Sequence, residues 1–342
     1  MRPFFSFQWH ITDECDQRCR HCYIYAGATL KKPKHMAWRS MGGVLEKCLR
    51  MADTFGRVPY FYLTGGDPLL HPHFWDLAEQ LKKLKIAFAI LGNPFHLDDA
   101  VCARLKDCGC EKYQLSLDGL QATHDFIRKA GSFACTLGKI PCLRKAGITS
   151  VIMTTVSGLN MEEVPQLIDT VVAHGVDVYS FARFCPENGP LEIPPLKYRQ
   201  FLEICSEKFK AHENSGCATY FNKKDHLWKL YEYETGEFTM PDACEPGLIY
   251  DGCNCGNCHL TILPDGEVLA CRRARGSAVG NVLRHELAQL WLHEMEKYRE
   301  YTRFKKCGKC ELLAWCRGCP AVAGAGSGDF YAADPQCWKE VA

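Results

Sequence analysis

The sequence has no long apolar segment and no excess charge of either sign. Its 342 residues include 41 Lys and Arg against 40 Asp and Glu, a formal net charge of +1. A nearly neutral chain has no bulk electrostatic attraction to nucleic acid or to an anionic membrane. No apolar run approaches the length of a membrane span. We therefore expect neither nucleic acid nor a membrane as a partner.

The first residues also lack the basic, apolar and small-residue order of a secretory signal. We therefore expect a cytoplasmic protein, in which thiols stay reduced and disulfide frameworks are rare. Against these absences stand 22 cysteines. Three lie between residues 15 and 22 and ten between residues 244 and 337. Metal binding is the remaining explanation for thiols grouped in this way.

The first two thirds of the chain alternate between strand-like and helix-like patterns. Strands are expected at residues 4–11, 59–63, 86–91, 112–117, 149–155 and 176–181. Helices are expected at residues 40–54, 73–84, 98–106, 133–146 and 161–174, and a charged helical stretch at 196–233. Strands joined by helical crossovers predict a parallel sheet, either open or closed into a barrel. Six strands are two short of a complete eight-stranded barrel.

Cys15, Cys19 and Cys22 follow the first expected strand in a C-x3-C-x2-C run. Spacings this short bring three thiolates to one metal centre. Zinc would need a fourth ligand, which His21 could supply. An iron–sulfur cube held by three cysteines would instead leave one iron open for chemistry. The spacing alone predicts a metal site without choosing the metal.

Polar residues stand where the second and fourth expected strands end. The carboxyl ends of parallel strands are where α/β folds bind ligands. Paired glycines would let the backbone approach a ligand, and an Asp would offer a carboxylate to an ammonium group. The candidates are Thr64, Gly65, Gly66, Asp67, Ser116 and Asp118, with Arg128 downstream.

The C-terminal third contains two further groups of thiols. The first group flanks an expected hairpin, with strands at 260–263 and 268–270 and a turn at 264–266. On spacing alone, zinc is the better interpretation of such groups. The residues are Cys253, Cys255, Cys258 and Cys271, then Cys307, Cys310, Cys316, Cys319 and Cys337.

Taken together, these motifs resemble the radical S-adenosylmethionine (radical SAM) enzymes. The resemblance rests on the C-x3-C-x2-C run followed by Tyr23, on GGDP in place of the family's GGE-P, and on SLDG followed by Arg128. It implies an α/β fold built as a partial (β/α)6 TIM-like barrel. It also implies that Cys15, Cys19 and Cys22 hold a [4Fe-4S] cluster whose open iron binds SAM.

The resemblance further implies how SAM is held. Gly65, Gly66 and Asp67 would contact the methionine amino group, Asp67 being one carbon shorter than the usual Glu. Ser116 and Arg128 would contact the ribose or the carboxylate, and Tyr23 would lie near the adenine. Thr64 and Asp118 complete the expected cofactor-binding set.

Behind such a core, the C-terminal third resembles a SPASM domain, a small Cys-rich domain with a β-hairpin and two auxiliary [4Fe-4S] clusters. Three clusters are therefore expected in all. The resemblance implies a distal cluster on Cys307, Cys310, Cys316 and Cys337. It implies a proximal cluster on Cys253, Cys271 and Cys319, with Cys258 as the fourth ligand and Cys255 as its competitor. The expected domains are residues 1–190 (radical SAM core), 191–243 (helical bridge) and 244–342 (SPASM domain).

The other cysteines are expected to be small buried hydrophobic residues. They are Cys48, Cys102, Cys108, Cys110, Cys135, Cys142, Cys185, Cys205 and Cys217.

The implied function is a maturase of a ribosomally made peptide. Reductive cleavage of SAM would give a 5′-deoxyadenosyl radical that abstracts hydrogen from the peptide, installing a thioether or carbon–carbon crosslink or another change such as epimerisation. The expected partners are the precursor peptide and a reductant such as flavodoxin or ferredoxin. Because only one strand precedes Cys15, we expect the leader of a leader-bearing peptide to be bound by a separate leader-binding protein or by the barrel itself.

Two other functions remain open. The first is an anaerobic sulfatase-maturing enzyme that forms formylglycine, but such enzymes carry an Asp where this chain has Arg272. The second is a non-catalytic zinc or electron-transfer protein. We also expect Arg272, Arg273 and Arg275 to form a basic rim that holds an acidic leader or a carboxylate, with solvated surface cations as the alternative.

Overall fold

The computed structural model describes residues 3–25, 32–186, 193–245 and 247–341. Its strands form one sheet in the order β10-β9-β8-β1-β2-β3-β4-β5-β6-β7. The strands are β1 (Phe4–Thr12), β2 (Val58–Gly65), β3 (Phe88–Leu91), β4 (Cys110–Ser116), β5 (Thr149–Val156), β6 (Val178–Arg183), β7 (Tyr220–Asn222), β8 (His259–Ile262), β9 (Glu267–Leu269) and β10 (Ala278–Asn281).

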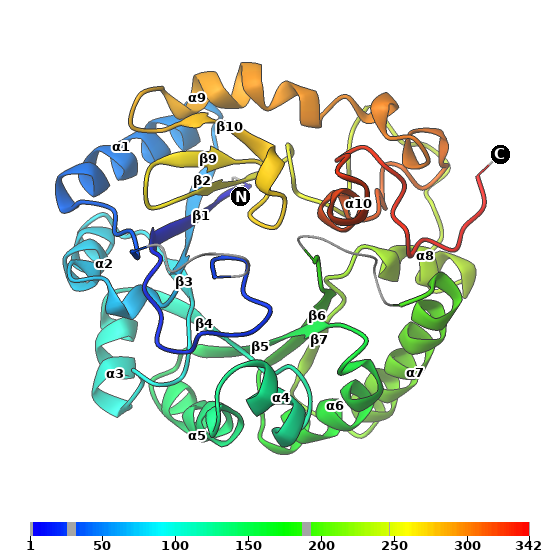
Figure 1. Cartoon of the computed structure of the whole chain (residues 1–342), viewed down its shortest axis with the longest axis horizontal. Coiled ribbons are helices and arrows are strands. Elements are labelled where there is room, and N and C mark those ends of the chain that lie inside the picture. The colour runs from blue at the N-terminus through cyan, green and yellow to red at the C-terminus, as the bar shows by residue number, and fades with distance from the viewer. Residues whose placement is uncertain (1–2, 26–31, 187–192, 246, 342) are drawn as a thin grey trace.

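Helices surround the outer face of this curved sheet (Figure 1). They are α1 (Trp38–Thr54), α2 (Phe74–Lys83), α3 (Asp99–Asp107), α4 (Gln121–Ile127), α5 (Ser132–Lys145), α6 (Val164–Ala173), α7 (Pro195–Asn214), α8 (Leu227–Glu234), α9 (Leu287–Gln289) and α10 (Pro320–Ser327). Strands β1 to β7 pair in parallel in chain order. The fold is the expected partial β/α barrel.

The two faces of β1 explain how the barrel is built. Phe7 and Trp9 are fully buried in the hydrophobic core, whereas Ser6 and Gln8, on the opposite face, line an internal cavity. Side chains alternate between faces along a strand, so one strand serves both the core and the cavity. Helix α1 covers the outer face with a stripe of buried residues at helical spacing, which includes Met41, Val44, Leu45, Cys48, Met51 and Ala52.

All six expected barrel strands are present, but the continuous helical stretch expected at 196–233 is wrong. It contains α7, the short strand β7 and α8. Strand β7 pairs in parallel with β6 and adds a seventh strand to the barrel. Its Phe221 stacks on Phe209 of α7, with the ring centroids 4.3 Å apart. Three residues are too few to show a period-two pattern, so the longer helical periodicity of the flanking residues hid the strand.

The expected hairpin is present as β8 and β9, which pair antiparallel. Strand β8 also pairs in parallel with β1, with Ser6 opposite His259 and Trp9 opposite Ile262. The hairpin therefore extends the barrel sheet past β1 and brings the cysteines that flank it to the barrel. Within the described ranges, no helix combines the length and apolarity needed to cross a bilayer.

Candidate active site

One cavity of about 1860 Å³ lies inside the barrel. Its wall combines the barrel strands with the Cys-rich segment, residues 244–341. Of the residues predicted from sequence, this wall includes Cys15, Cys19, Cys22, Tyr23, Thr64, Gly65, Gly66, Ser116, Arg128, Cys253 and Cys271. Asp67, Asp118, Cys258 and Cys319 are not among its lining residues. The structure thus brings most of the predicted residues together in one chamber.

Residues 13–25, the cluster loop, carry the first three thiols directly after β1. The Gln17 amide donates a hydrogen bond to the Cys15 sulfur at 3.4 Å, and the Arg128 guanidinium donates one to the Cys19 sulfur at 3.6 Å. Burial raises the pKa of Cys15 above its usual range and that of Cys19 to about 11. Donors aimed at the sulfurs suit thiolates, and a bound metal would supply the positive charge that displaces the protons. These residues therefore fit a metal cluster.

Gly65 and Gly66 hold the end of β2 against the cluster loop. A Cβ atom at Gly65 would lie 2.0 Å from the Thr12 carbonyl oxygen, and one at Gly66 would lie 2.0 Å from that of Glu14. The Gly66 amide donates to the Thr12 carbonyl at 2.9 Å. The close approach predicted for these glycines is therefore made to the backbone of the cluster loop, although both also line the cavity.

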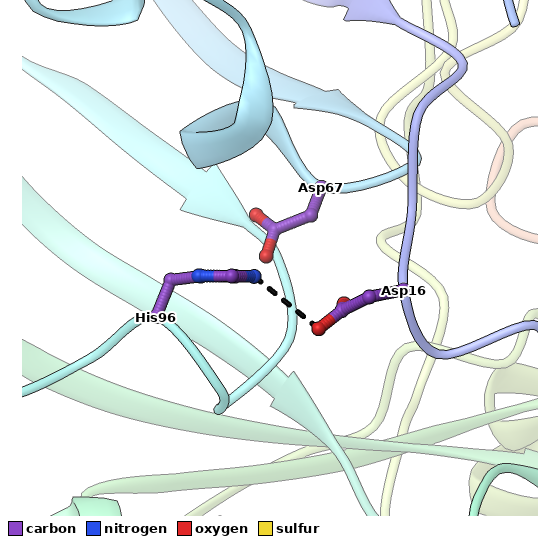
Figure 2. A group of neighbouring side chains, drawn as sticks. All are labelled: Asp16, Asp67 and His96. Carbon is purple, nitrogen blue, oxygen red and sulfur yellow. Dashed lines mark ion pairs between the residues drawn. The ribbon is translucent and has the colours of Figure 1, made fainter.

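Asp67 is fully buried and lies beside Asp16 and His96. Figure 2 shows the three side chains converging from the cluster loop, the end of β2 and the loop after β3. Asp16 pairs with His96 at 3.3 Å, while the Asp67 Oδ2 atom has no hydrogen-bond partner in the described structure. Burial, with the nearby charge of Asp16, raises the pKa of Asp67 to about 7. Two carboxylates with one unpaired buried oxygen would suit a cation such as the ammonium group expected there.

Asp118 ties the end of β4 to the cluster loop. It accepts hydrogen bonds from Arg128 at 2.5 Å and from the Thr155 amide at 2.8 Å, and it pairs with His21 at 3.1 Å. Burial alone would raise its pKa, but Arg128 and His21 hold the pKa of Asp118 well below its usual range. His21 is thus engaged by a carboxylate. Asp118 positions Arg128 against Cys19 and does not itself reach the cavity.

The distal thiols gather as the sequence predicts. Cys307, Cys310, Cys316 and Cys337 line one small pocket of the Cys-rich segment. The Cys316 thiol donates to the His226 carbonyl at 3.2 Å, and the Lys306 ammonium donates to the Cys337 carbonyl at 3.0 Å. Four thiols around one pocket, with a cation beside them, fit an anionic metal cluster.

The proximal thiols are Cys253, Cys255, Cys271 and Cys319. The first three line the cavity, and Cys319 lies in a small buried group against which Cys271 packs. Cys255 lines the cavity and its amide donates to the Cys253 sulfur at 3.4 Å. Cys258 lies outside the wall, and its carbonyl accepts the Ser6 amide at 2.9 Å. The geometry therefore favours Cys255 over Cys258 beside Cys253.

Two guanidinium groups accompany the proximal thiols. Arg273 donates to the Cys319 sulfur at 3.3 Å. Arg317 is only 3% exposed. Both terminal nitrogens of its guanidinium are buried and have no hydrogen-bond partner in the described structure. A buried cation without a counter-charge is costly, and thiolates around an iron–sulfur cluster would provide that charge. The site fits such a group.

The basic rim expected at Arg272, Arg273 and Arg275 is not an open surface. Arg272 is only 9% exposed and lies over the Tyr23 ring, 4.3 Å from its centroid. Arg273 donates to the Arg183 carbonyl at 3.2 Å. Both residues line the cavity, where Arg272 joins the Cys-rich segment to the cluster loop and Arg273 joins it to the end of β6. The Arg275 side chain lies outside the described residues.

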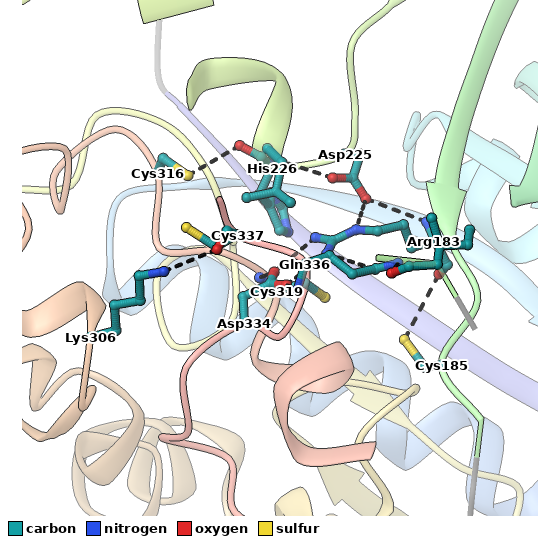
Figure 3. A network of polar contacts seen from close by, with 12 residues as sticks. Arg183, Cys185, Asp225, His226, Lys306, Cys316, Cys319, Asp334, Gln336 and Cys337 are labelled. Atoms are coloured by element: carbon teal, nitrogen blue, oxygen red, sulfur yellow. Dashed lines mark hydrogen bonds and ion pairs between the residues drawn. The ribbon is translucent and has the colours of Figure 1, made fainter. Parts of the chain in front are cut away.

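Arg183, at the end of β6, is a residue that the motifs did not reveal. It is 1% exposed and donates to Asp225 at 2.9 Å, to both oxygens of Asp334 at 2.7 and 2.8 Å, and to Gln336 at 3.0 Å. Asp334 also accepts the Cys319 amide at 2.8 Å. Figure 3 shows this network between the barrel and the thiols. The strand-end rule that identified Asp67 and Ser116 would have found Arg183 on the sixth strand.

The comparisons with known proteins agree with this geometry. Residues 9–171 match the family model of the Radical SAM superfamily, and residues 253–320 match that of the SPASM iron–sulfur cluster-binding domain. The AdoMet-dependent heme synthase of Methanosarcina barkeri is 27% identical over 357 residues, covering 96% of this chain and 95% of that protein.

Two further proteins place the chain among related folds. The mycofactocin maturase MftC of Mycobacterium ulcerans is 24% identical, covering 96% of this chain and 86% of its own length. The crystal structure of Streptococcus suis SuiB bound to S-adenosylmethionine superposes with a TM-score of 0.76 at 19% identity, covering 98% of this chain and 78% of SuiB. The SuiB likeness establishes the fold.

Replacing Arg183 by Ala should strongly destabilise the protein, because Asp225 and Asp334 would become unpaired buried charges. We expect a loss of about 3–5 kcal/mol in the free energy of unfolding, measured by urea denaturation. The matched control Arg199→Ala removes the more exposed pair with Glu234 and should cost at most about 1 kcal/mol. Equal losses in the two variants would contradict the structural role of Arg183.

Replacing Asp67 by Asn should stabilise the protein in a pH-dependent way. The pKa of Asp67 is raised from 3.8 to about 7, so the folded state favours the protonated carboxyl group. The free-energy cost that ionised Asp67 imposes on the folded state therefore grows between about pH 4 and pH 7 and then levels off. At about 1.4 kcal/mol per pKa unit, the gain is at most about 4 kcal/mol at pH 8. Thermal unfolding without added SAM measures it, with Asp107→Asn as the exposed control. A gain that is independent of pH would contradict the burial argument.

Proposed function

Because the chain belongs to the radical SAM superfamily and carries a SPASM iron–sulfur cluster-binding domain, we propose that this enzyme is a maturase of a ribosomally made peptide. The modification would be a thioether or carbon–carbon crosslink, or another change such as epimerisation. The observation that carries the proposal is the large cavity lined by both the cluster loop and three of the proximal thiols, Cys253, Cys255 and Cys271. A chamber of about 1860 Å³ has room for a peptide segment beside SAM.

Cys15, Cys19 and Cys22 would hold the SAM-binding [4Fe-4S] cluster, and the proximal and distal thiols would hold two auxiliary clusters. When bound, the first cluster and SAM supply one-electron hydrogen abstraction from carbon. The residues of the protein position the bound groups. Arg128 and the Gln17 amide direct hydrogen-bond donors at the cluster-loop sulfurs. Ser116 and Tyr23 line the chamber where SAM would lie.

The proposed division of the chain assigns residues 1–190 to the radical SAM core, 191–243 to a bridge and 244–342 to the SPASM domain. The bridge contains β7, which pairs with β6, and α8, which leads to the Cys-rich segment. It would thus continue the barrel as well as connect two domains. A reductant such as flavodoxin or ferredoxin and a separate leader-binding protein remain proposed partners.

The charge of the cavity wall favours an anionic substrate. Nine Lys and Arg residues but only three Asp and Glu residues line the cavity. Lys224 and Arg272 form no ion pair with another described residue, so carboxylates of a substrate could pair with them. An acidic peptide would suit this wall.

The same observation supports a second candidate, the modification of a tetrapyrrole that carries carboxylates. It is motivated by the similarity to the AdoMet-dependent heme synthase of Methanosarcina barkeri. Formylglycine formation is disfavoured because Arg272, which stands where sulfatase maturases carry an Asp, is held against the Tyr23 ring. An arginine in that position cannot act as a general base near neutral pH.

The radical SAM assignment predicts reductive cleavage of SAM. Under a strong reductant without oxygen, the iron-loaded wild type should form 5′-deoxyadenosine, measured by liquid chromatography and mass spectrometry. A Cys15/Cys19/Cys22→Ala variant should fall to background, because no thiolates remain to hold the cluster. The control Cys135→Ala should retain the wild-type rate. Cleavage that persists in the triple variant would refute the assigned ligands.

The substrate is tested by co-expression with candidate precursor peptides, read by intact mass. A crosslink should remove two hydrogen atoms, whereas epimerisation should leave the mass unchanged in H₂O and add deuterium in D₂O. The control is the Cys15/Cys19/Cys22→Ala variant, in which the peptides should stay unmodified. Unmodified peptides together with turnover of an added carboxylated tetrapyrrole would favour the second candidate.

A further inference from the structure

Cys185 lies two residues after β6, and its thiol reaches the thiols of the Cys-rich segment. The Cys185 thiol donates a hydrogen bond to the Arg183 carbonyl at 3.9 Å. Cys185 and Cys271 both pack against the small buried group that contains Cys319. Cys185 also lines the cavity. Thiols from three distant parts of the chain therefore meet at one point.

The surroundings of Cys185 differ from those of Cys48 and Cys205, two of the other cysteines expected to be structural. For Cys48 and Cys205, burial alone raises the pKa of the thiol, so neither has a charged or thiol neighbour that shifts it. Cys185 instead has the guanidinium of Arg273 and the sulfur of Cys319 beside it. The expectation that Cys185 is only a small buried hydrophobic residue does not account for these two neighbours.

The backbone around Cys185 is held by the network that also holds Cys319. The Arg183 side chain pairs with Asp334, which accepts the Cys319 amide at 2.8 Å. The Arg183 carbonyl accepts a hydrogen bond from Arg273, which also donates to the Cys319 sulfur at 3.3 Å. Figure 3 shows Cys185 and Cys319 near this network. Ligands fixed by such contacts are pre-organised for a metal.

We propose that Cys185 is a ligand of the proximal iron–sulfur cluster, supplied by the barrel. It would complete a set with Cys253, Cys271 and Cys319, in the place that the sequence assigned to Cys258, with Cys255 as the other candidate for that place. One cluster would then be bonded to both the barrel and the SPASM domain. The inference rests on the proposed auxiliary clusters but not on the identity of the substrate.

Iron binding tests the inference in the full chain. In a Cys15/Cys19/Cys22→Ala background, only the auxiliary clusters remain after anaerobic loading with iron and sulfide. Adding Cys185→Ala should lower the iron content by up to one cube, about four atoms per chain, or give the electron paramagnetic resonance signal of a three-iron cluster. The matched control is Cys217→Ala, which removes a partly buried thiol that precedes β7 and does not line the cavity. Iron, sulfide and spectra identical to those of the control would overturn the inference.

Alkylation of the wild type decides the question if Cys185→Ala does not fold. In iron-loaded protein treated with iodoacetamide, Cys185 should be modified about tenfold or more slowly than after removal of the iron with a chelator, as read by peptide mass spectrometry. Cys217 should react equally in both states. Equal rates at Cys185 before and after iron removal would also overturn the inference.

The two readouts separate this inference from the proposed function. One outcome is a wild type that cleaves SAM although iron does not slow the alkylation of Cys185. That result would support the radical SAM chemistry and refute only the assignment of Cys185 as a cluster ligand. Iron-dependent protection of Cys185 without SAM cleavage would support the ligand and refute the proposed chemistry.

Discussion

The buried charge of Arg183 is the constraint on which the rest of the site depends. A guanidinium that is 1% exposed must be paired, and its partners come from two distant parts of the chain, Asp225 before α8 and Asp334 near the C-terminus. Satisfying this one cation therefore brings the end of the Cys-rich segment to the end of β6. Because Asp334 also accepts the Cys319 amide, the same contact positions a thiol of the proximal group.

The pairing of Arg183 with Asp334 helps to bring two groups of thiols, which lie far apart in the sequence, to one chamber. The cluster loop enters the chamber after β1, and the hairpin of β8 and β9 brings Cys271 to the other side of β1. Arg272 spans the two, because it follows Cys271 and lies over the Tyr23 ring. The cations Arg273 and Arg317 then lie where anionic clusters would form. Charge, topology and thiol position agree within a single cavity.

The parts that depend on local pattern could be predicted from the sequence. The six barrel strands and the hairpin follow from periodicity and turn signals, because each is decided by neighbours in the chain. The set of four distal thiols instead comes from the resemblance to SPASM domains, since Cys337 is far in sequence from the other three. The roles of Gly65 and Gly66 were harder to assign. A glycine pair signals a close approach, but only the structure identifies the partner as the backbone of Thr12 and Glu14.

The parts that depend on long-range pairing could not be predicted. Cys185 stands alone in the sequence, and only the docking of the Cys-rich segment gives it thiol neighbours. The strand β7 is too short for a pattern, and it is fixed by its pairing with β6. The most direct test of this account is amide hydrogen exchange, measured by mass spectrometry, in Arg183→Gln and wild type. Faster exchange at both residues 178–186 and residues 316–337 is predicted, whereas faster exchange confined to the β6 region would contradict it.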